Sequence, residues 1–352
     1  MLLYIVILLI LGFLSLSNIH SISKLNRNIV LTILILFIGL RKEIGVDWEQ
    51  YINILDRFGF RSLDYIFSTN EPLYFFTNWL SAQTGQGIVL VNVICASIFS
   101  FGLIRYCRKQ PYPWLALLTA FPILIVAVSL GYTRQSAAIG FWFIGLTLLE
   151  KNYITSSSLF IFLSSLMHLP SMFLFSIPLS KFSTILKQIK YYIPILVLTP
   201  IIFRGTVTRF SNTFLGLYYN YSSMLANLNG FLFRILLPVL AITIFLMNYN
   251  KFKKIDSTEI SYIYKVISIL LLLLLFTSIV LPQSLVVVDR LSLYLYPITI
   301  YVFSRLPLLK LFKLSSYSWR FIITVLISSY TIFWLLFASH APWFVPYKSF
   351  LF

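Results

Sequence analysis

The chain has 352 residues, of which 59% are hydrophobic and only 11% are charged. Soluble domains carry about 25% charged residues, and no soluble fold of this length buries so much apolar surface. The composition therefore excludes a soluble protein. It predicts an all-α, polytopic transmembrane protein that forms a single integral membrane domain over residues 1–352.

Charge and metal-binding residue types narrow the class further. The net charge is +17, yet residues 41–71 hold six of the ten acidic residues, so the rest of the chain is strongly basic. Basic loops are typical of the cytoplasmic side of a membrane protein, whereas nucleic-acid binding needs a soluble basic domain. The two cysteines and three histidines lack disulfide or zinc spacing. We therefore expect no metal and no cofactor.

The apolar runs, taken in chain order, predict about 11–12 membrane segments. The first run lacks the basic start and small-residue cleavage site of a signal peptide, so we expect a retained helix. Segment 70–84 is aromatic but punctuated by polar residues, which favours an interfacial helix or a shallow hairpin. The predicted spans are Leu2–Leu16, Ile29–Leu40, Ile88–Tyr106, Trp114–Tyr132, Ser136–Leu149, Thr155–Ser180, Tyr191–Phe203, Phe231–Asn248, Tyr262–Leu281, Leu285–Phe303 and Phe321–Ser339.

The orientation follows from lysine and arginine in the short loops, which favour the cytoplasm. The opposite side then receives loops 41–71 and 204–230, which we expect to cap the active site, together with the turn at 132–134 and the C-terminal tail. Almost all residues capable of chemistry are therefore predicted on the non-cytoplasmic side. The basic clusters are Lys24/Arg27, Arg105/Arg108/Lys109, Lys181/Lys187/Lys190, Lys251/Lys253/Lys254/Lys265 and Arg305/Lys310/Lys313/Arg320.

Segment 155–180 conflicts with a simple alternation of sides. Lys151 and Lys181 flank it, and both favour the cytoplasm, so one straight span would place a basic loop outside. Pro170 breaks a helix near its middle. The pattern favours a hairpin of two short helices with His168 at its tip; the alternative is one kinked span with a basic external loop.

The first candidate constellation is the run RKEIGVDWEQY, which begins directly after a predicted span. Arg41 could grip a phosphate, and Asp47 could orient or deprotonate a sugar hydroxyl. Gly45 permits a tight turn, and a helix starting there would put Asp47 and Tyr51 on one face, beside Trp48. The alternative is a charged interfacial loop that merely ends a helix.

Two further candidates are single polar groups at membrane depth. Arg134, followed by Gln135, begins a predicted helix, and a helix N-terminus adds free amides and a positive dipole to an anion site. The alternative is an arginine that extends toward the membrane surface.

His168 is suited to proton transfer near neutral pH, although a lone histidine is more often a packing residue.

The remaining candidates lie in the second half of the chain. Asp289 and Arg290 are adjacent, so on a helix they face different partners, and Arg290 shares its face with Tyr294. The alternative is a self-neutralising ion pair. Loop 204–234 carries Arg209 and the aromatics Tyr218–Tyr221, which could hold phosphate and sugar. An ordinary interfacial aromatic belt explains that loop equally well.

Taken in order, RKEIGVDWEQY, NEPLYFF, YTRQSAAIG, MHLPS, VDRLSLYLY and PYKSF resemble the EpsG-like family of Wzy-type bacterial polysaccharide polymerases. The resemblance spans most of the chain. The family usually has Thr before the acid of the first motif and Tyr after it, where this chain has Val46 and Trp48. It also tends to have a small polar residue soon after the histidine, here Ser171.

The resemblance implies a GT-C-like glycosyltransferase in the bacterial cytoplasmic membrane, with its site facing outward. Such enzymes move a growing glycan from undecaprenyl diphosphate to the non-reducing end of a lipid-linked repeat unit, without a nucleotide sugar. A flippase and a chain-length regulator would be pathway partners. For this chemistry we hypothesise that Arg41, Arg134 and Arg290 bind the diphosphate and that His168 or Asp47 is the base. The other expected substrate-binding residues are Trp48, Tyr51, Gln135, Arg209, Tyr218, Asp289 and Tyr294.

Two other classes compete with the polymerase. A flippase or other transporter of lipid-linked oligosaccharide also carries intramembrane arginines, but transporters usually show internal repeats and polar residues in both halves of the membrane. A membrane acyltransferase would need a base near a cytoplasmic acyl donor, whereas the cytoplasmic loops here are basic. We expect Arg41, Arg134, His168 and Arg290 to converge in one extracytoplasmic vestibule if the chain is a polymerase.

Overall fold

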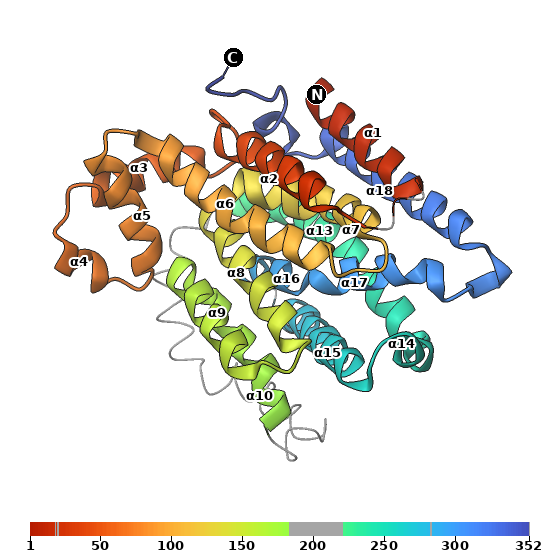
Figure 1. The fold of residues 1–352 in the computed structure, drawn as a ribbon. Helices are drawn as coiled ribbons and strands as arrows, with labels where there is room; N and C mark the ends of the chain where they lie inside the picture. Colours follow the sequence, from red (N-terminus) through yellow and green to blue (C-terminus); the bar gives the residue numbers. More distant parts are fainter. Residues whose placement is uncertain (18, 20, 183–220, 282–283, 352) are drawn as a thin grey trace.

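A computed structural model describes residues 1–17, 19, 21–182, 221–281 and 284–351, and its named elements are all helices (Figure 1). The prediction of an all-α fold is confirmed. In chain order the elements are α1 (Leu2–Leu16), α2 (Lys24–Gly39), α3 (Trp48–Phe58), α4 (Leu63–Phe67), α5 (Pro72–Gln83), α6 (Gly87–Cys107), α7 (Pro113–Ala120), η1 (Phe121–Ser129), α8 (Thr133–Leu149), α9 (Ile154–Met167), η2 (Leu169–Phe175), α10 (Ser176–Phe182), α13 (Tyr221–Met247), α14 (Tyr249–Ile255), α15 (Thr258–Val280), α16 (Leu285–Ser292), η5 (Leu293–Leu295), α17 (Pro297–Arg305), η6 (Leu306–Leu308), η7 (Leu311–Lys313), α18 (Ser316–Phe337) and η8 (Ala341–Trp343).

Four described helices are long and apolar enough to cross a membrane: α6, the Gly230–Met247 part of α13, α15 and α18. A fifth span results if the bent pair of α16–η5 and α17–η6 is counted as one. Helices α1 and α9 and the continuous segment α7–η1 are apolar but shorter. The chain is a multi-pass membrane protein, and the predicted span 191–203 lies outside the described residues.

Two predicted spans depart from a single regular α-helix. Residues 285–303 were expected as one helix, but the pair bends by 43° where Pro297 begins α17. Segment 114–132 continues from α7 into the π-helix η1, whose second residue is Pro122. Proline has no backbone N–H, so the regular helical ladder is interrupted at both places.

Helices α6 and α8 cross with their backbones in contact. A Cβ atom added to Gly102 would lie 2.0 Å from the carbonyl oxygen of Gly140, and one added to Gly140 would lie 2.5 Å from that of Ile98. Small residues permit this close approach, which stabilises helix pairs in membranes. The crossing fixes α8, whose first turn carries Arg134.

We expect Gly140→Ala to destabilise the protein by about 1–3 kcal/mol, because α6 backbone atoms must shift to admit the methyl group. Gly12→Ala is the matched control, since its Cβ would meet only the Thr324 Cγ2 atom at an ordinary 3.4 Å. Thermal unfolding in detergent measures both variants. Equal melting temperatures would contradict the tight crossing.

The predicted hairpin is present in segment 155–180. Helix α9 ends at Met167, His168 is extended, and η2 and α10 follow. The chain returns to its starting side, because the Lys181 ammonium donates to the carbonyl of Leu149 at 3.2 Å and to the Asn152 side-chain oxygen at 2.6 Å. His168 therefore lies at the tip, as predicted.

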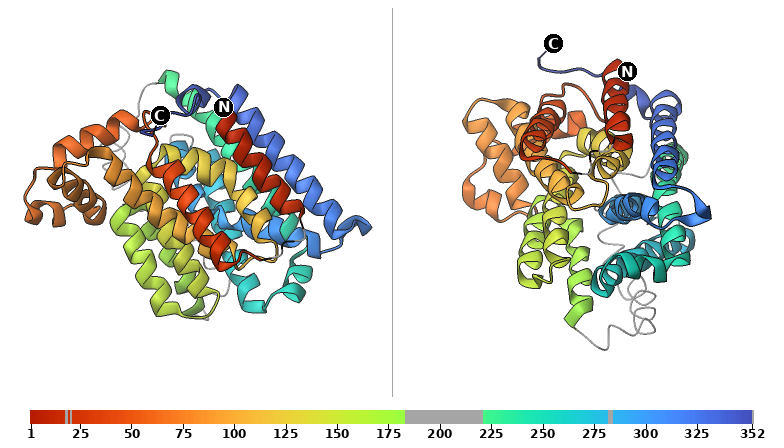
Figure 2. Two further views of the ribbon diagram at one scale, coloured as in Figure 1. Left: turned by 45° about the horizontal axis from the view of Figure 1, so that its top comes forward. Right: turned by 45° about the vertical axis from the view of Figure 1, so that its right-hand side comes forward.

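The two ends of the bundle differ. The N- and C-terminal segments meet at one end (Figure 1), where the Tyr4 hydroxyl donates to the carbonyl of Phe344 at 2.7 Å. Helices α3–α5 project sideways from the bundle (Figure 2). The other end, called the basic end, holds the contacts of Lys109 with Thr147 and of Arg320 with Ser17.

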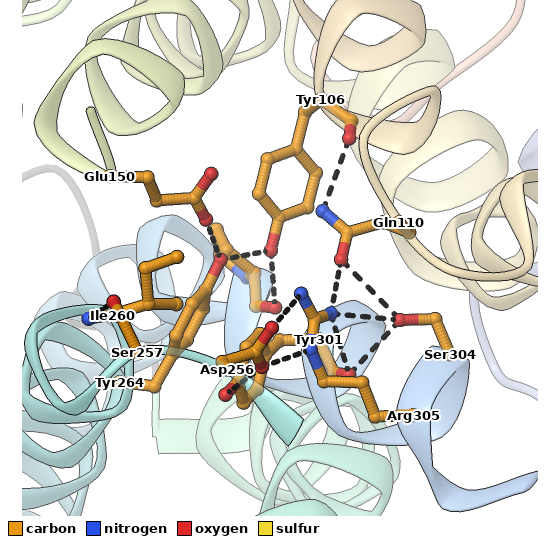
Figure 3. Close-up of polar contacts among 11 residues, drawn as sticks. Tyr106, Gln110, Glu150, Asp256, Ser257, Ile260, Tyr264, Tyr301, Ser304 and Arg305 are labelled. Carbon is orange, nitrogen blue, oxygen red and sulfur yellow. Dashed lines mark hydrogen bonds and ion pairs between the residues drawn. The ribbon is translucent and has the colours of Figure 1, made fainter. Parts of the chain in front are cut away.

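The basic end also contains a buried polar network, which corrects the expectation that chemistry-capable residues lie almost entirely at one side (Figure 3). Arg305 pairs with Asp256 at 2.5 Å, and the Tyr264 hydroxyl donates to Glu150 at 2.6 Å. Its tyrosines were indistinguishable in sequence from an interfacial belt. The network joins the ends of α6, α8 and α17 to the start of α15 through Tyr106, Gln110, Glu150, Asp256, Tyr264, Tyr301, Ser304 and Arg305.

Candidate active site

The loop after α2 touches the backbone that precedes α8. Gly45 has φ +99°, a conformation that side chains disfavour, and an added Cβ would lie 2.6 Å from the carbonyl oxygen of Leu130 and 2.8 Å from the Gly131 Cα atom. Only glycine fits this contact. It brings the first motif, with Asp47, beside the motif that begins at Tyr132.

The C-terminal tail packs on the same loop. The Lys42 N–H donates to the carbonyl of Lys348 at 3.0 Å, and the Phe350 N–H donates to that of Leu40 at 2.9 Å. The Gly45 N–H donates to the carbonyl of Trp343 at 3.0 Å. The terminal PYKSF run is thereby fixed against the first motif, although about 300 residues separate them.

Glu71 links Arg134 to the hairpin tip. Arg134 lies in the first turn of α8, and its Nη1 atom contacts the Glu71 Oε2 atom at 2.7 Å. The other carboxylate oxygen accepts the Leu169 N–H at 3.0 Å. The neighbouring His168 Nδ1 atom lies 2.7 Å from the hydroxyl of Tyr294. Four separate segments therefore meet around one carboxylate and one imidazole.

Arg290 lies on the other side of the α8 N-terminus. Its Nη2 atom is 3.5 Å from the Asp47 Oδ2 atom, and its guanidinium carbon is 3.5 Å from the centre of the Tyr132 ring. The Gln135 amide donates to the Arg290 carbonyl at 2.5 Å. The ion pair is long and partly exposed, so the guanidinium keeps access to solvent and to a ligand.

Asp289 pairs with Arg234 and not with its neighbour Arg290. Two hydrogen bonds, of 2.8 and 2.7 Å, join the guanidinium fork to both carboxylate oxygens, and both side chains are buried. The self-neutralising pair considered from sequence is therefore wrong. The helix turns adjacent residues toward different partners, as the alternative prediction required.

A pocket of about 90 Å³ opens beside Arg290 and the Arg234–Asp289 pair, and its lining does not include Glu71, Arg134 or His168. His340, from the segment after α18, faces it, and burial lowers the pKa of its imidazole, as do Arg234 and Arg290. The pocket is lined by Val46, Asp47, Tyr132, Arg234, Leu285, Val286, Asp289, Arg290 and His340.

Arg41 lies beneath this surface rather than on it. Its side chain is 1% exposed, and it donates to the carbonyl of Ile38 and to the Thr133 hydroxyl, each at 2.6 Å. A direct grip on a ligand phosphate does not fit this placement. Arg41 instead holds the residue that precedes Arg134.

The other predicted site residues have mixed placements. The helix expected after Gly45 begins at Trp48, whose ring contacts Phe350. Tyr51 is buried against Tyr74, and burial raises the pKa of its phenol. The predicted sugar contacts Arg209 and Tyr218 lie outside the described residues.

Sequence reasoning did not assign three residues that the structure places in the site. Arg234 ends the loop 204–234, which was considered for phosphate and sugar binding, whereas Glu71 and His340 lie in segments that were noted for other reasons. The available signal for Glu71 was an acid directly before Pro72 in an aromatic segment. Among the described residues, no three His, Cys, Asp or Glu side chains gather as metal ligands would.

Comparison with known proteins identifies one family. The model of the EpsG family matches residues 24–349, a range that contains all the segments that meet at the site. The resemblance inferred from the motifs is thereby confirmed. Searches of curated proteins and of solved structures gave no significant match.

Proposed function

The chain belongs to the EpsG family, and from this premise we propose that it is a polysaccharide polymerase acting at the extracytoplasmic face of the bacterial cytoplasmic membrane. One observation carries the proposal. Asp47, Arg134, His168 and Arg290 come from four distant parts of the sequence and lie around one helix N-terminus. This end of the bundle is opposite the basic end, which the positive-inside rule assigns to the cytoplasm.

The proposed reaction transfers a glycan without a nucleotide. The bond between the anomeric carbon of the growing chain and the diphosphate oxygen breaks, and undecaprenyl diphosphate leaves. The acceptor hydroxyl at the non-reducing end of an incoming repeat unit forms the new bond and gives up its proton. Arg290 and Arg134 stabilise the charge that develops on the leaving diphosphate. His168 or Asp47 accepts the proton.

Arg41 has a different role in this scheme. Because it is buried and bound to Thr133, we assign it to the support of the α8 N-terminus and not to the diphosphate. The Arg234–Asp289 pair likewise forms a wall of the pocket, since each partner already satisfies the other.

Purified protein in detergent, supplied only with lipid-linked repeat units, tests the proposal. We expect glycan ladders and released undecaprenyl diphosphate, with neither a nucleotide nor an acyl donor present. The proposal would be refuted if the repeat units are recovered unchanged although a melting transition shows that the protein is folded.

The buried network at the basic end favours one alternative, a transporter of lipid-linked oligosaccharide. Polar groups in both halves of the membrane are typical of transporters, and Glu150 and Arg305 supply them there. Proteoliposomes separate the two functions. A transporter moves the labelled lipid between leaflets without lengthening its glycan, whereas a polymerase lengthens the glycan.

A further inference from the structure

The partly buried Arg134–Glu71 contact differs from the buried Arg234–Asp289 ion pair. Asp289 places both of its oxygens on the single guanidinium of Arg234. Glu71 gives only one oxygen to Arg134 and gives the other to the Leu169 N–H. A monodentate contact leaves the remaining donors of the arginine fork available to a planar or tetrahedral anion.

Polar atoms without a hydrogen-bond partner occur on Arg134 itself and on two residues that lie close in sequence to the residues of this contact. The Nε atom of Arg134 is buried and has no hydrogen-bond partner among the described residues, and the same holds for the Gln135 Oε1 atom and the Ser171 hydroxyl. Gln135 and Ser171 are at most 2% exposed. A buried polar atom without a partner is destabilising, so a polar ligand that supplied a partner to the Arg134 Nε atom would be stabilised.

Charge limits how such a ligand binds. Arg134, Arg234 and Arg290 are each paired with an acid, namely Glu71, Asp289 and Asp47. A lipid-linked diphosphate that approached Arg134 would meet the like charge of Glu71 at close range. Either the Glu71 carboxylate moves away, or the affinity of this site for the diphosphate falls.

We propose that Glu71 is a built-in competitor for an anion subsite at Arg134, which a polyprenyl-linked diphosphate displaces, and that this displacement releases the hairpin tip. The inference rests on the proposed function and adds a role for a residue outside the reaction steps given above. Glu71 holds the tip through the Leu169 N–H, so its departure frees the backbone next to His168. When the diphosphate of the donor lipid binds at Arg134, the His168 imidazole therefore changes position.

Binding of farnesyl diphosphate to the purified full-length protein tests the competition. Glu71→Gln removes the charge but keeps a carbonyl oxygen for the Leu169 N–H, and it should tighten binding by about fivefold or more. Glu49→Gln, an exposed acid on α3, makes the same change in net charge and should leave the affinity unchanged. Arg134→Ala should abolish binding at this subsite.

Hydrogen exchange of the tip gives a second readout that needs no substitution. Farnesyl diphosphate should accelerate exchange of the Leu169 amide in the wild-type chain, because that N–H loses its acceptor. Suppose that the wild-type protein binds farnesyl diphosphate and Arg134→Ala does not. If Glu71→Gln then binds with unchanged affinity, or if the exchange rate of the Leu169 amide does not change, the role of Glu71 is overturned and the proposed function stands. A wild-type chain that neither binds the diphosphate nor forms polymer overturns the proposed function as well.

Discussion

Arg290→Ala should reduce polymer formation by about 100- to 1,000-fold while the protein remains folded in the membrane. The expected loss is that of a positioned charge that stabilises a developing oxyanion. Arg290 contacts Asp47 only at 3.5 Å and is partly exposed, so removing that ion pair should cost less than about 1 kcal/mol of stability. Glycan ladders and melting temperature, measured on the same preparation, separate the two effects.

The controls for Arg290 test charge and geometry separately. Arg57→Ala changes an exposed arginine of α3 and should give normal ladders. Arg290→Lys keeps the charge but loses the planar fork, so it should restore part of the activity. Full-length ladders from Arg290→Ala would show that the pocket does not hold the leaving diphosphate.

The sequence predicts well those features that depend on local chemistry. The helix after Gly45 begins at Trp48 because the glycine turns the chain there. The hairpin follows from Lys151 and Lys181, since one side of the membrane must accept both charges, and Pro170 marks the position of its tip. These are constraints that each segment carries on its own.

The partners of charged residues are not local, and here the prediction failed. Glu71 lies 63 positions from Arg134, and Asp289 lies 55 positions from Arg234. Each acid has several arginines within possible reach, and only the packing of the helices selects one. For the same reason Arg41, which looks like an anion ligand in its motif, lies buried against Thr133.

The polar network at the basic end escaped prediction for a related reason. Tyr106 and Tyr264 occur in apolar runs, where tyrosine normally marks the membrane interface. Their hydroxyls instead lie 2.7 Å apart in the interior, next to Glu150. Hydrophobic periodicity locates a helix in the membrane, but it does not reveal which of its polar atoms meet across helices.

Asp289→Ala should destabilise the protein more than any other single change in the site, by about 3–5 kcal/mol. The substitution leaves the Arg234 guanidinium buried without a counter-charge, since the two side chains are only 7% and 8% exposed. Thermal unfolding in detergent, followed by tryptophan fluorescence, measures the loss. Polymer formation should fall in parallel, because Asp289 also lines the pocket.

The double variant Arg234→Met/Asp289→Leu determines the source of that destabilisation. If it comes from an unpaired buried charge, two apolar side chains of similar volume should recover most of the melting temperature. If the double variant melts as low as Asp289→Ala, the pair contributes through its specific geometry instead. A wild-type melting temperature for Asp289→Ala alone would contradict the buried pair, because an isolated guanidinium cannot remain in this wall at no cost. If the double variant recovers stability but not activity, the Arg234–Asp289 pair contributes to activity through the shape and charge of the pocket.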